Sequence, residues 1–130
     1  MTLEEHINYW IESADDDIES ATSNFNSKRY NWCLFIGHLV LEKALKALYV
    51  QNSNNLIPPK THNLLKLAEL SNIELNREQA KFFSDVNRFQ IEARYSEFKT
   101  ELYKLATEEF TFNNFNQIKE QYKWLKSLLK

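Results

Sequence analysis

Residues 32–50 have the sequence WCLFIGHLVLEKALKALYV, and this stretch decides the fold. Most of its side chains are apolar, and the polar exceptions include His38, Glu42, Lys43 and Lys46. A helix of this composition has to be buried on nearly every side. Its polar groups need partners inside the fold, or a cleft that opens onto them, because an unpaired buried charge is costly. We therefore look for a functional site along this helix.

Length and cysteine content indicate a single domain in a reducing compartment. A chain of 130 residues is predicted to form one domain over residues 1–130 and to bury roughly two thirds of its unfolded surface. Cys33 is the only cysteine, which excludes a disulfide framework and a metal site built from cysteines.

The N-terminus and the charge balance narrow the function classes. Residues 1–5, MTLEE, lack a basic stretch followed by an apolar run, and no segment is apolar for long enough to span a bilayer. We expect a cytoplasmic protein without membrane contact. With 16 basic and 18 acidic residues the net charge is −2, which argues against RNA as a partner. We interpret the lysines at 119, 123, 126 and 130 as a solvated helix face.

The apolar spacing is helical almost throughout, and one glycine and two prolines leave few places to turn. We predict an all-α fold, an up-and-down bundle of four long helices plus one short helix. The first long helix starts at a capping box, Thr2 with Glu5, and ends near Phe25. The second runs from about Tyr30 to Val50.

The later helices follow a polar loop over residues 51–59. A short helix follows Thr61, and a long one follows the capping pair Asn76 and Gln79 and ends near Ile91. Residues 92–113 are predicted to be an irregular crossing segment, with at most a turn or two of helix at 102–106. The last helix is predicted to open at Asn114.

Motifs along almost the whole chain resemble the HEPN domain family. The motifs follow one another in the order that the family shows. They are a pattern in the first helix, a helix with the sequence EKALKA, the sequence KTH after a loop with two prolines, and the sequence ARY. The matching residues are Trp10, Ala14, Asp17, Ile18, Ala21, Tyr30, 42–48, 60–62, Leu64, Leu67 and 91–95. The resemblance implies a bundle of four to five helices, often homodimeric. It also implies a prokaryotic group encoded beside minimal nucleotidyltransferases and linked to nucleotide binding or RNA cleavage.

Many nucleases of that family carry an arginine followed four to six residues later by a histidine, and this chain lacks that pair. The chemistry needs an imidazole near the 2′-hydroxyl and a cation on the phosphate. Arg29 precedes His38 by nine residues, about half a turn out of phase at ~100° per residue. The other arginines after residue 29 follow the last histidine. A nonlocal pair, Arg94 with His38, stays open, but no catalytic residue is predicted.

His38, Glu42 and Lys46 recur at intervals of four residues and line one edge of the buried helix. One interpretation is a polar cleft that recognises a nucleotide or a partner protein. The other is an internal Glu42–Lys46 ion pair beside a satisfied histidine.

Asp17 lies at the edge of the apolar stripe of the first helix, about 20° from Trp10. It should have a cationic partner, and Lys43, Lys46 or Arg94 would supply one. We predict that these residues form one cluster which, with His38, Glu42 and Tyr95, marks the ligand or partner cleft.

Lys60, Thr61 and His62 stand at an expected helix start, where free backbone N–H groups favour a phosphate. The alternative is that Thr61 merely caps the helix. His6, His38 and Glu42 lack the spacing of metal ligands, so we predict no metal and no cofactor.

Two function classes remain. The first is a non-catalytic HEPN-type binding module, which binds nucleotide or serves as the partner subunit of a nucleotidyltransferase. The second is an RNase toxin with a rearranged Arg/His site. We also expect a homodimer, because the apolar helix and the crowded phenylalanines at 82, 83, 89, 110, 112 and 115 offer surplus apolar surface.

Overall fold

The computed structural model describes residues 1–94 and 96–130, with the side chains of residues 96–100 outside that description. Every regular element in this described part is a helix, so the all-α prediction is confirmed. The six helices are α1 (Leu3–Asn26), α2 (Tyr30–Ser53), α3 (Leu64–Leu70), α4 (Arg77–Arg94), α5 (Ser96–Leu105) and α6 (Glu108–Ser127).

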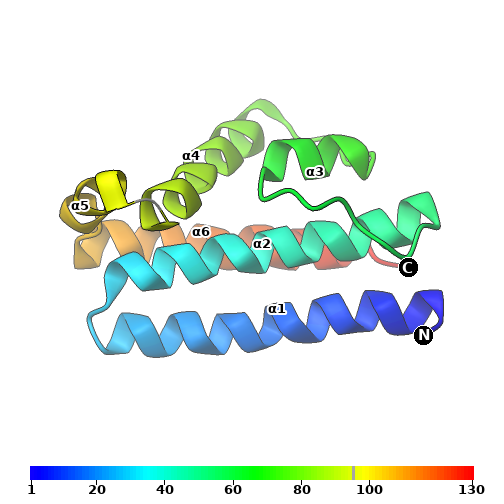
Figure 1. Cartoon of the computed structure of the whole chain (residues 1–130), viewed down its shortest axis with the longest axis horizontal. Coiled ribbons are helices and arrows are strands. Elements are labelled where there is room, and N and C mark those ends of the chain that lie inside the picture. Colours follow the sequence, from blue (N-terminus) through cyan, green and yellow to red (C-terminus); the bar gives the residue numbers. More distant parts are fainter. Residues whose placement is uncertain (95) are drawn as a thin grey trace.

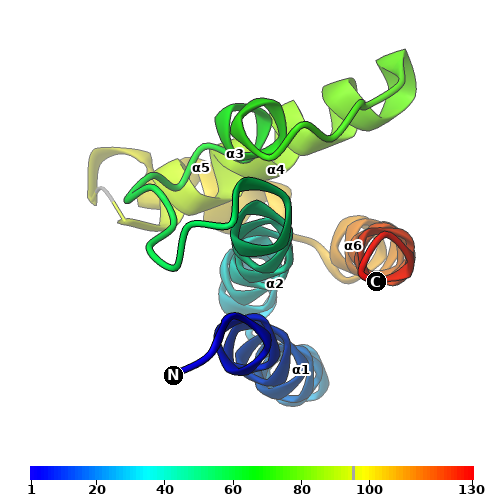
Figure 2. The same ribbon diagram turned by 90° about the vertical axis from the view of Figure 1, so that its right-hand side faces the viewer.

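The buried helix α2 is the centre of the molecule. It contacts each of the other five helices. In Figure 1, α1, α2 and α6 run alongside one another, whereas α4 crosses at an angle. Figure 2 looks along α2 and shows α1 on one side of it, α3 and α4 on the opposite side, and α6 beside it. This position follows from the sequence, because α2 has no continuous polar face to present to water.

Close packing between α2 and α6 depends on the one glycine of the chain. A Cβ atom on Gly37 would lie 2.7 Å from Cδ1 of Ile118. Because this glycine lies inside α2, the turns between helices use other residues in the left-handed region. These residues are Lys28 (φ 63°), Asn54 (φ 57°) and Asn72 (φ 59°). Asparagine tolerates this conformation better than most residues, and lysine does not.

The capping predictions hold at the first and fourth helices. Thr2 accepts a hydrogen bond from the Glu5 N–H at 3.1 Å. Asn76 and Gln79 cap each other reciprocally at 2.8 and 3.0 Å. The second helix continues three residues beyond the predicted end at Val50, to Ser53.

The prediction of an irregular segment over 92–113 is wrong. The fourth helix continues to Arg94, α5 spans Ser96–Leu105, and α6 begins at Glu108, so the three helices together occupy most of the segment. The cap of α6 is Thr107, whose side chain accepts from the Phe110 N–H at 3.2 Å. The predicted cap Asn114 instead lies inside the helix, where its amide donates to the Phe110 carbonyl at 2.9 Å. In the described part of the chain, no helix is both long and apolar enough to cross a membrane.

Candidate functional site

His38 is sealed inside the bundle. Its side chain is 0% exposed, and Nε2–H donates to the backbone carbonyl of His62 at 2.8 Å. Nδ1 then carries the lone pair, has no hydrogen-bond partner, and lies 3.8 Å from Oε1 of Glu42. Burial lowers the pKa of His38 to about 4; Glu42 opposes this shift, and the charge of Arg94 contributes to it. His38 is therefore neutral at pH 7 and inaccessible to a substrate.

Glu42 connects α2 to the loop before α3. Its Oε1 accepts a hydrogen bond from Nδ1 of His62 at 2.8 Å, and its Oε2 pairs with the Lys46 ammonium at 3.1 Å. The Lys46 ammonium also lies 5.3 Å from the ring centroid of Trp10 on α1. The Glu42–Lys46 ion pair considered in the sequence is present, and Glu42 binds an imidazole as well. That imidazole belongs to His62, not to His38.

Asp17 has the cationic partner that its position predicts. Its Oδ2 lies 2.7 Å from the Lys43 ammonium, which also donates to the Ser13 hydroxyl at 2.7 Å. The contact is an ion pair rather than a well-aligned hydrogen bond, because Oδ2 accepts no bond of good geometry. This pair fastens α1 to α2.

The prediction of one connected cluster is wrong. Within the described part of the chain, Lys43 pairs with Asp17 and Lys46 with Glu42, and no hydrogen bond or ion pair joins the two groups. Arg94 belongs to neither group, because its guanidinium lies over the Phe35 ring at 5.5 Å. The physical reason is the position of the helices: α1 and α4 lie on opposite sides of α2 (Figure 2), so Asp17 and Arg94 are separated by the core. Tyr95, also predicted for the cleft, lies outside the described residues.

A small pocket opens beside His62. Its volume is about 100 Å³, and its lining residues are His62, Asn63, Asn87, Gln90 and Ile91. The His62 side chain is 46% exposed, with Glu42 behind it. Arg94 does not line this pocket, but it lies one helical turn beyond Gln90 on α4. We call His62, Asn87, Gln90 and Arg94 the His62 cleft.

The start of α3 differs from the expected phosphate site. Thr61 does not cap the helix; Asn63 does, with its side chain accepting from the N–H groups of Leu65 and Lys66. The Leu64 N–H donates to Asn87 at 2.9 Å. The N–H groups at this helix start are thus engaged within the protein. A phosphate site formed by Lys60, Thr61 and His62 stays a prediction. The backbone N–H groups at the start of α3 would not contribute to it, because they already donate to Asn63 and Asn87.

Sequence reasoning missed Asn63, Asn87 and Gln90. Gln90 carried a signal, because it is a polar residue, here 7% exposed, on the buried face of α4. Asn63 carried the local signal of an N-cap residue before an apolar run, whereas Asn87 carried none. The side chains of Asn63 and Asn87 meet at 3.1 Å only after the chain between them has folded.

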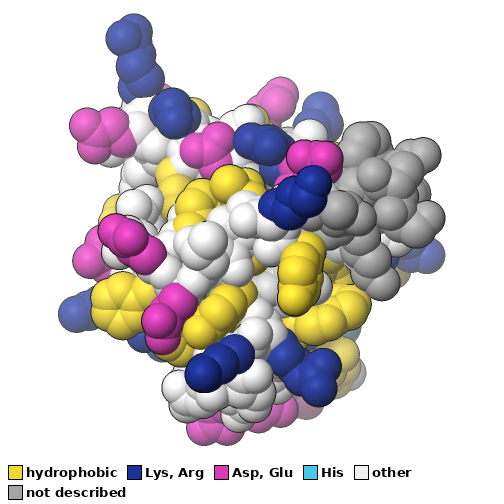
Figure 3. Space-filling model, turned by 90° about the vertical axis from the view of Figure 1, so that its left-hand side faces the viewer, with side chains coloured by type: hydrophobic (Ala, Val, Ile, Leu, Met, Phe, Trp, Pro, Cys, Tyr) yellow, Lys and Arg dark blue, Asp and Glu magenta, His cyan; other side chains and the backbone are white. Residues whose placement is uncertain are grey.

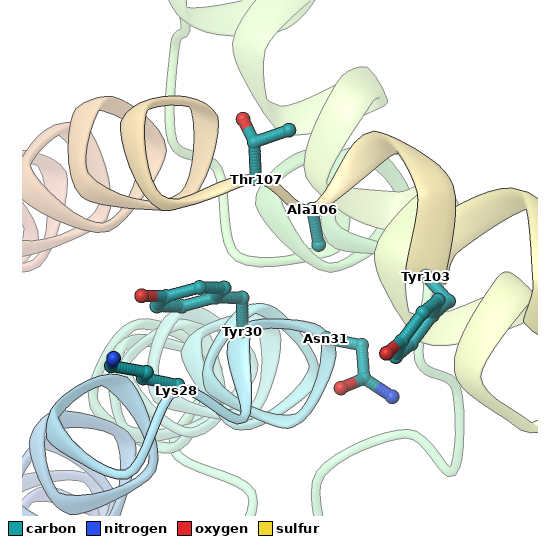
Figure 4. Close-up of a pocket in the computed structure, with 6 residues that line it drawn as sticks. All are labelled: Lys28, Tyr30, Asn31, Tyr103, Ala106 and Thr107. Atoms are coloured by element: carbon teal, nitrogen blue, oxygen red, sulfur yellow. The ribbon is translucent and has the colours of Figure 1, made fainter.

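A second hollow lies at the far end of the bundle, where the α1–α2 turn meets the α5–α6 joint. It measures about 250 Å³ and is lined by Lys28, Tyr30, Asn31, Tyr103, Ala106 and Thr107 (Figure 4). Apolar side chains gather near the centre of this face, with charged ones around them (Figure 3). Burial and the nearby Glu108 carboxylate raise the pKa of Tyr30. Among the described residues, the lining of this hollow includes no histidine, aspartate or glutamate.

The comparison with known families identifies the chain. The family model of the HEPN domain matches residues 7–128. The chain belongs to the HEPN domain family. No curated protein and no solved structure gives a match. The HEPN match begins within α1 and ends beyond α6, so it contains the whole His62 cleft, and it supports a module related to nucleotides or RNA.

Proposed function

We propose that this chain is a non-catalytic HEPN-type binding module that takes a nucleotide phosphate at the His62 cleft. We further propose that it acts as the partner subunit of a minimal nucleotidyltransferase.

The observation that carries the proposal is the position of His62. Glu42 holds its Nδ1 at 2.8 Å, while the ring stays 46% exposed at a pocket lined by three amide side chains, those of Asn63, Asn87 and Gln90. Amide N–H groups and a guanidinium are donors that phosphate oxygens accept from, and so is the Nε2–H of a protonated imidazole whose Nδ1–H is already bound to a carboxylate. Arg94 supplies the guanidinium one turn further along α4.

The size of the pocket limits what enters it. A volume of about 100 Å³ is well below the roughly 300 Å³ at which small-molecule pockets begin. A single phosphate group fits this space, and the sugar and base of a nucleotide would remain outside it. The partner subunit would then cover the exposed part of the nucleotide.

The proposal that the module is non-catalytic rests on His38 and on the arginine positions. His38 is sealed and neutral, so it does not exchange protons with a bound RNA. No arginine precedes a histidine at the four-to-six-residue spacing of the family nucleases.

Nucleotide affinity tests the proposal. Titration with ATP should give saturable binding, and His62→Gln and Arg94→Ala should each weaken it about tenfold, since each removes a charge-assisted contact. His6→Gln and Arg77→Ala are matched controls, because both lie away from the cleft and should leave the affinity unchanged. Equal losses in the controls, or no saturable binding, would contradict the proposal.

The partner role needs a separate experiment. The tagged chain should recover a nucleotidyltransferase from its native host, with mass spectrometry identifying both the protein and any bound nucleotide. Recovery of the chain without a nucleotidyltransferase would remove this half of the proposal.

RNA cleavage is the second candidate function, and one contact favours it. The Glu42 carboxylate orients the His62 imidazole through Nδ1, as a general base requires. His62 therefore replaces His38 as the partner of Arg94 in this hypothesis. We expect no cleavage of single-stranded or structured RNA. Cleavage that disappears in both His62→Ala and Arg94→Ala would establish the nuclease, and cleavage unaffected by either would indicate contamination.

A further inference from the structure

A groove lies between α4 and α6, and none of its lining residues lines the pocket beside His62. Two adjoining hollows of about 590 and 440 Å³ form it and share Asn76 and Gln79. Here α4 crosses the bundle at an angle to α6 (Figure 1). The Gln79 amide donates to Gln121 at 3.1 Å and joins the two helices across the groove.

The groove is acidic. Its lining includes Glu74, Glu78 and Glu120, whereas none of the described residues that line it is a lysine or an arginine. All three carboxylates are exposed, and among the described residues none of them has an ion-pair partner. Three unpaired carboxylates along one groove favour a cationic occupant.

Two aromatic side chains lie among the carboxylates. Phe82 and Trp124 line the two hollows, and both are only partly buried while they pack against the core. A guanidinium stacks on an aromatic face and pairs with a carboxylate at the same time, which an ammonium does less well. Gln117 lines the groove with an amide that makes no hydrogen bond to the described residues, so it is free to bind a peptide backbone.

We propose that the α4–α6 groove docks an arginine-bearing segment of a partner protein. The guanidinium groups pair with Glu74, Glu78 and Glu120 and stack on Trp124 or Phe82, and the glutamine amides bind the backbone of the segment. This surface is separate from the His62 cleft and does not depend on nucleotide binding there.

A labelled alanine-based peptide with three arginines spaced one helical turn apart and one leucine is the probe. Fluorescence anisotropy measures its affinity, and the side-chain amide signals of Gln117 and Gln121 with the indole signal of Trp124 locate it by NMR. We expect saturable binding that shifts these three signals. A peptide with lysine in place of arginine should bind several times more weakly, and one with glutamate should not bind.

Charge-matched variants distinguish the groove from general attraction. Glu74→Gln, Glu78→Gln and Glu120→Gln together should weaken binding about tenfold. The control variant Glu12→Gln, Glu19→Gln and Glu69→Gln changes the net charge equally at exposed positions elsewhere. Equal losses in the two triple variants, shifts spread over the whole surface, equal binding of the lysine peptide, or no binding at all would overturn the proposal.

Discussion

At the scale of single residues, His38 sets a pH dependence of stability. Its pKa is about 4 in the folded chain against 6.5 for an ordinary histidine. The unfolded chain therefore takes up a proton first as the pH falls, so the folded state loses stability between about pH 6.5 and 4, by about 3 kcal/mol over the whole window. Urea unfolding at pH 7.5 and 4.5 measures this loss.

The variant His38→Gln isolates the effect, because its amide still donates to the His62 carbonyl but does not titrate. The loss of stability on acidification should be smaller in His38→Gln than in the wild type, and His6→Gln should behave like the wild type. Identical losses in the wild type and His38→Gln would show that His38 does not titrate abnormally.

Glu42 is the second residue whose removal should be costly. Its side chain is 6% exposed and pairs with Lys46, which is 11% exposed. Glu42→Gln leaves that ammonium without its counter-charge and should lower the free energy of unfolding by about 3 kcal/mol.

The control for Glu42 is an exposed pair of the same spacing. Lys81 and Asp85 lie 3.5 Å apart with side chains 81% and 47% exposed. Asp85→Asn should therefore cost less than about 1 kcal/mol. If Glu42→Gln costs no more than Asp85→Asn in chemical denaturation, the buried pair does not stabilise the fold.

Local contacts of the site were predictable from sequence, and distant ones were not. Glu42 and Lys46 are one helical turn apart, so their pair follows from helix geometry. The position of Asp17 at the edge of an apolar stripe predicted a cationic partner but left Lys43, Lys46 and Arg94 open. The Glu42–His62 bond joins residues 20 positions apart, and the path of the loop between them determines it. Nothing in the sequence fixes that path.

At the scale of helices, Gly37 tests the contact between α2 and α6. Alanine at a helix interior is favoured over glycine by about 1 kcal/mol. Here the added Cβ would meet Cδ1 of Ile118 at 2.7 Å, so Gly37→Ala should give little or none of that gain. In an Ile118→Val background, which lacks Cδ1, Gly37→Ala should stabilise the chain.

A double-mutant cycle by urea denaturation measures this coupling, and a favourable interaction of about 1 kcal/mol is expected. Additive effects of the two substitutions would mean that the helices do not approach closely at Gly37.

The helices with strong apolar periodicity were predictable, and the region from 92 to 113 was not. Thr107 followed by Glu108 and Glu109 is a helix start that local chemistry favours, with a capping hydroxyl and two carboxylates near the N-terminus. The weak apolar periodicity of residues 92–113 nevertheless led to the prediction of an irregular segment. The buried residues Leu102, Ala106 and Thr111 pack against neighbours that only the tertiary fold brings to them.

At the scale of the whole molecule, we predict a homodimer, although the structure changes the reason. The apolar surface of α2 is covered by the other helices of the same chain. The surplus lies elsewhere, at exposed side chains such as Ile91 (44%), Tyr103 (73%) and Phe112 (52%). Light scattering at tens of micromolar should give twice the mass of the chain, and a monomeric mass would contradict the prediction.

The most direct test of the proposed function follows the His62 ring itself during an NMR titration with ATP. We expect saturable shifts of the His62 ring and Arg94 guanidinium signals, with those of His6 unchanged. Shifts confined to other parts of the surface, or no saturable shift of His62 and Arg94, would contradict the assignment of nucleotide binding to the His62 cleft.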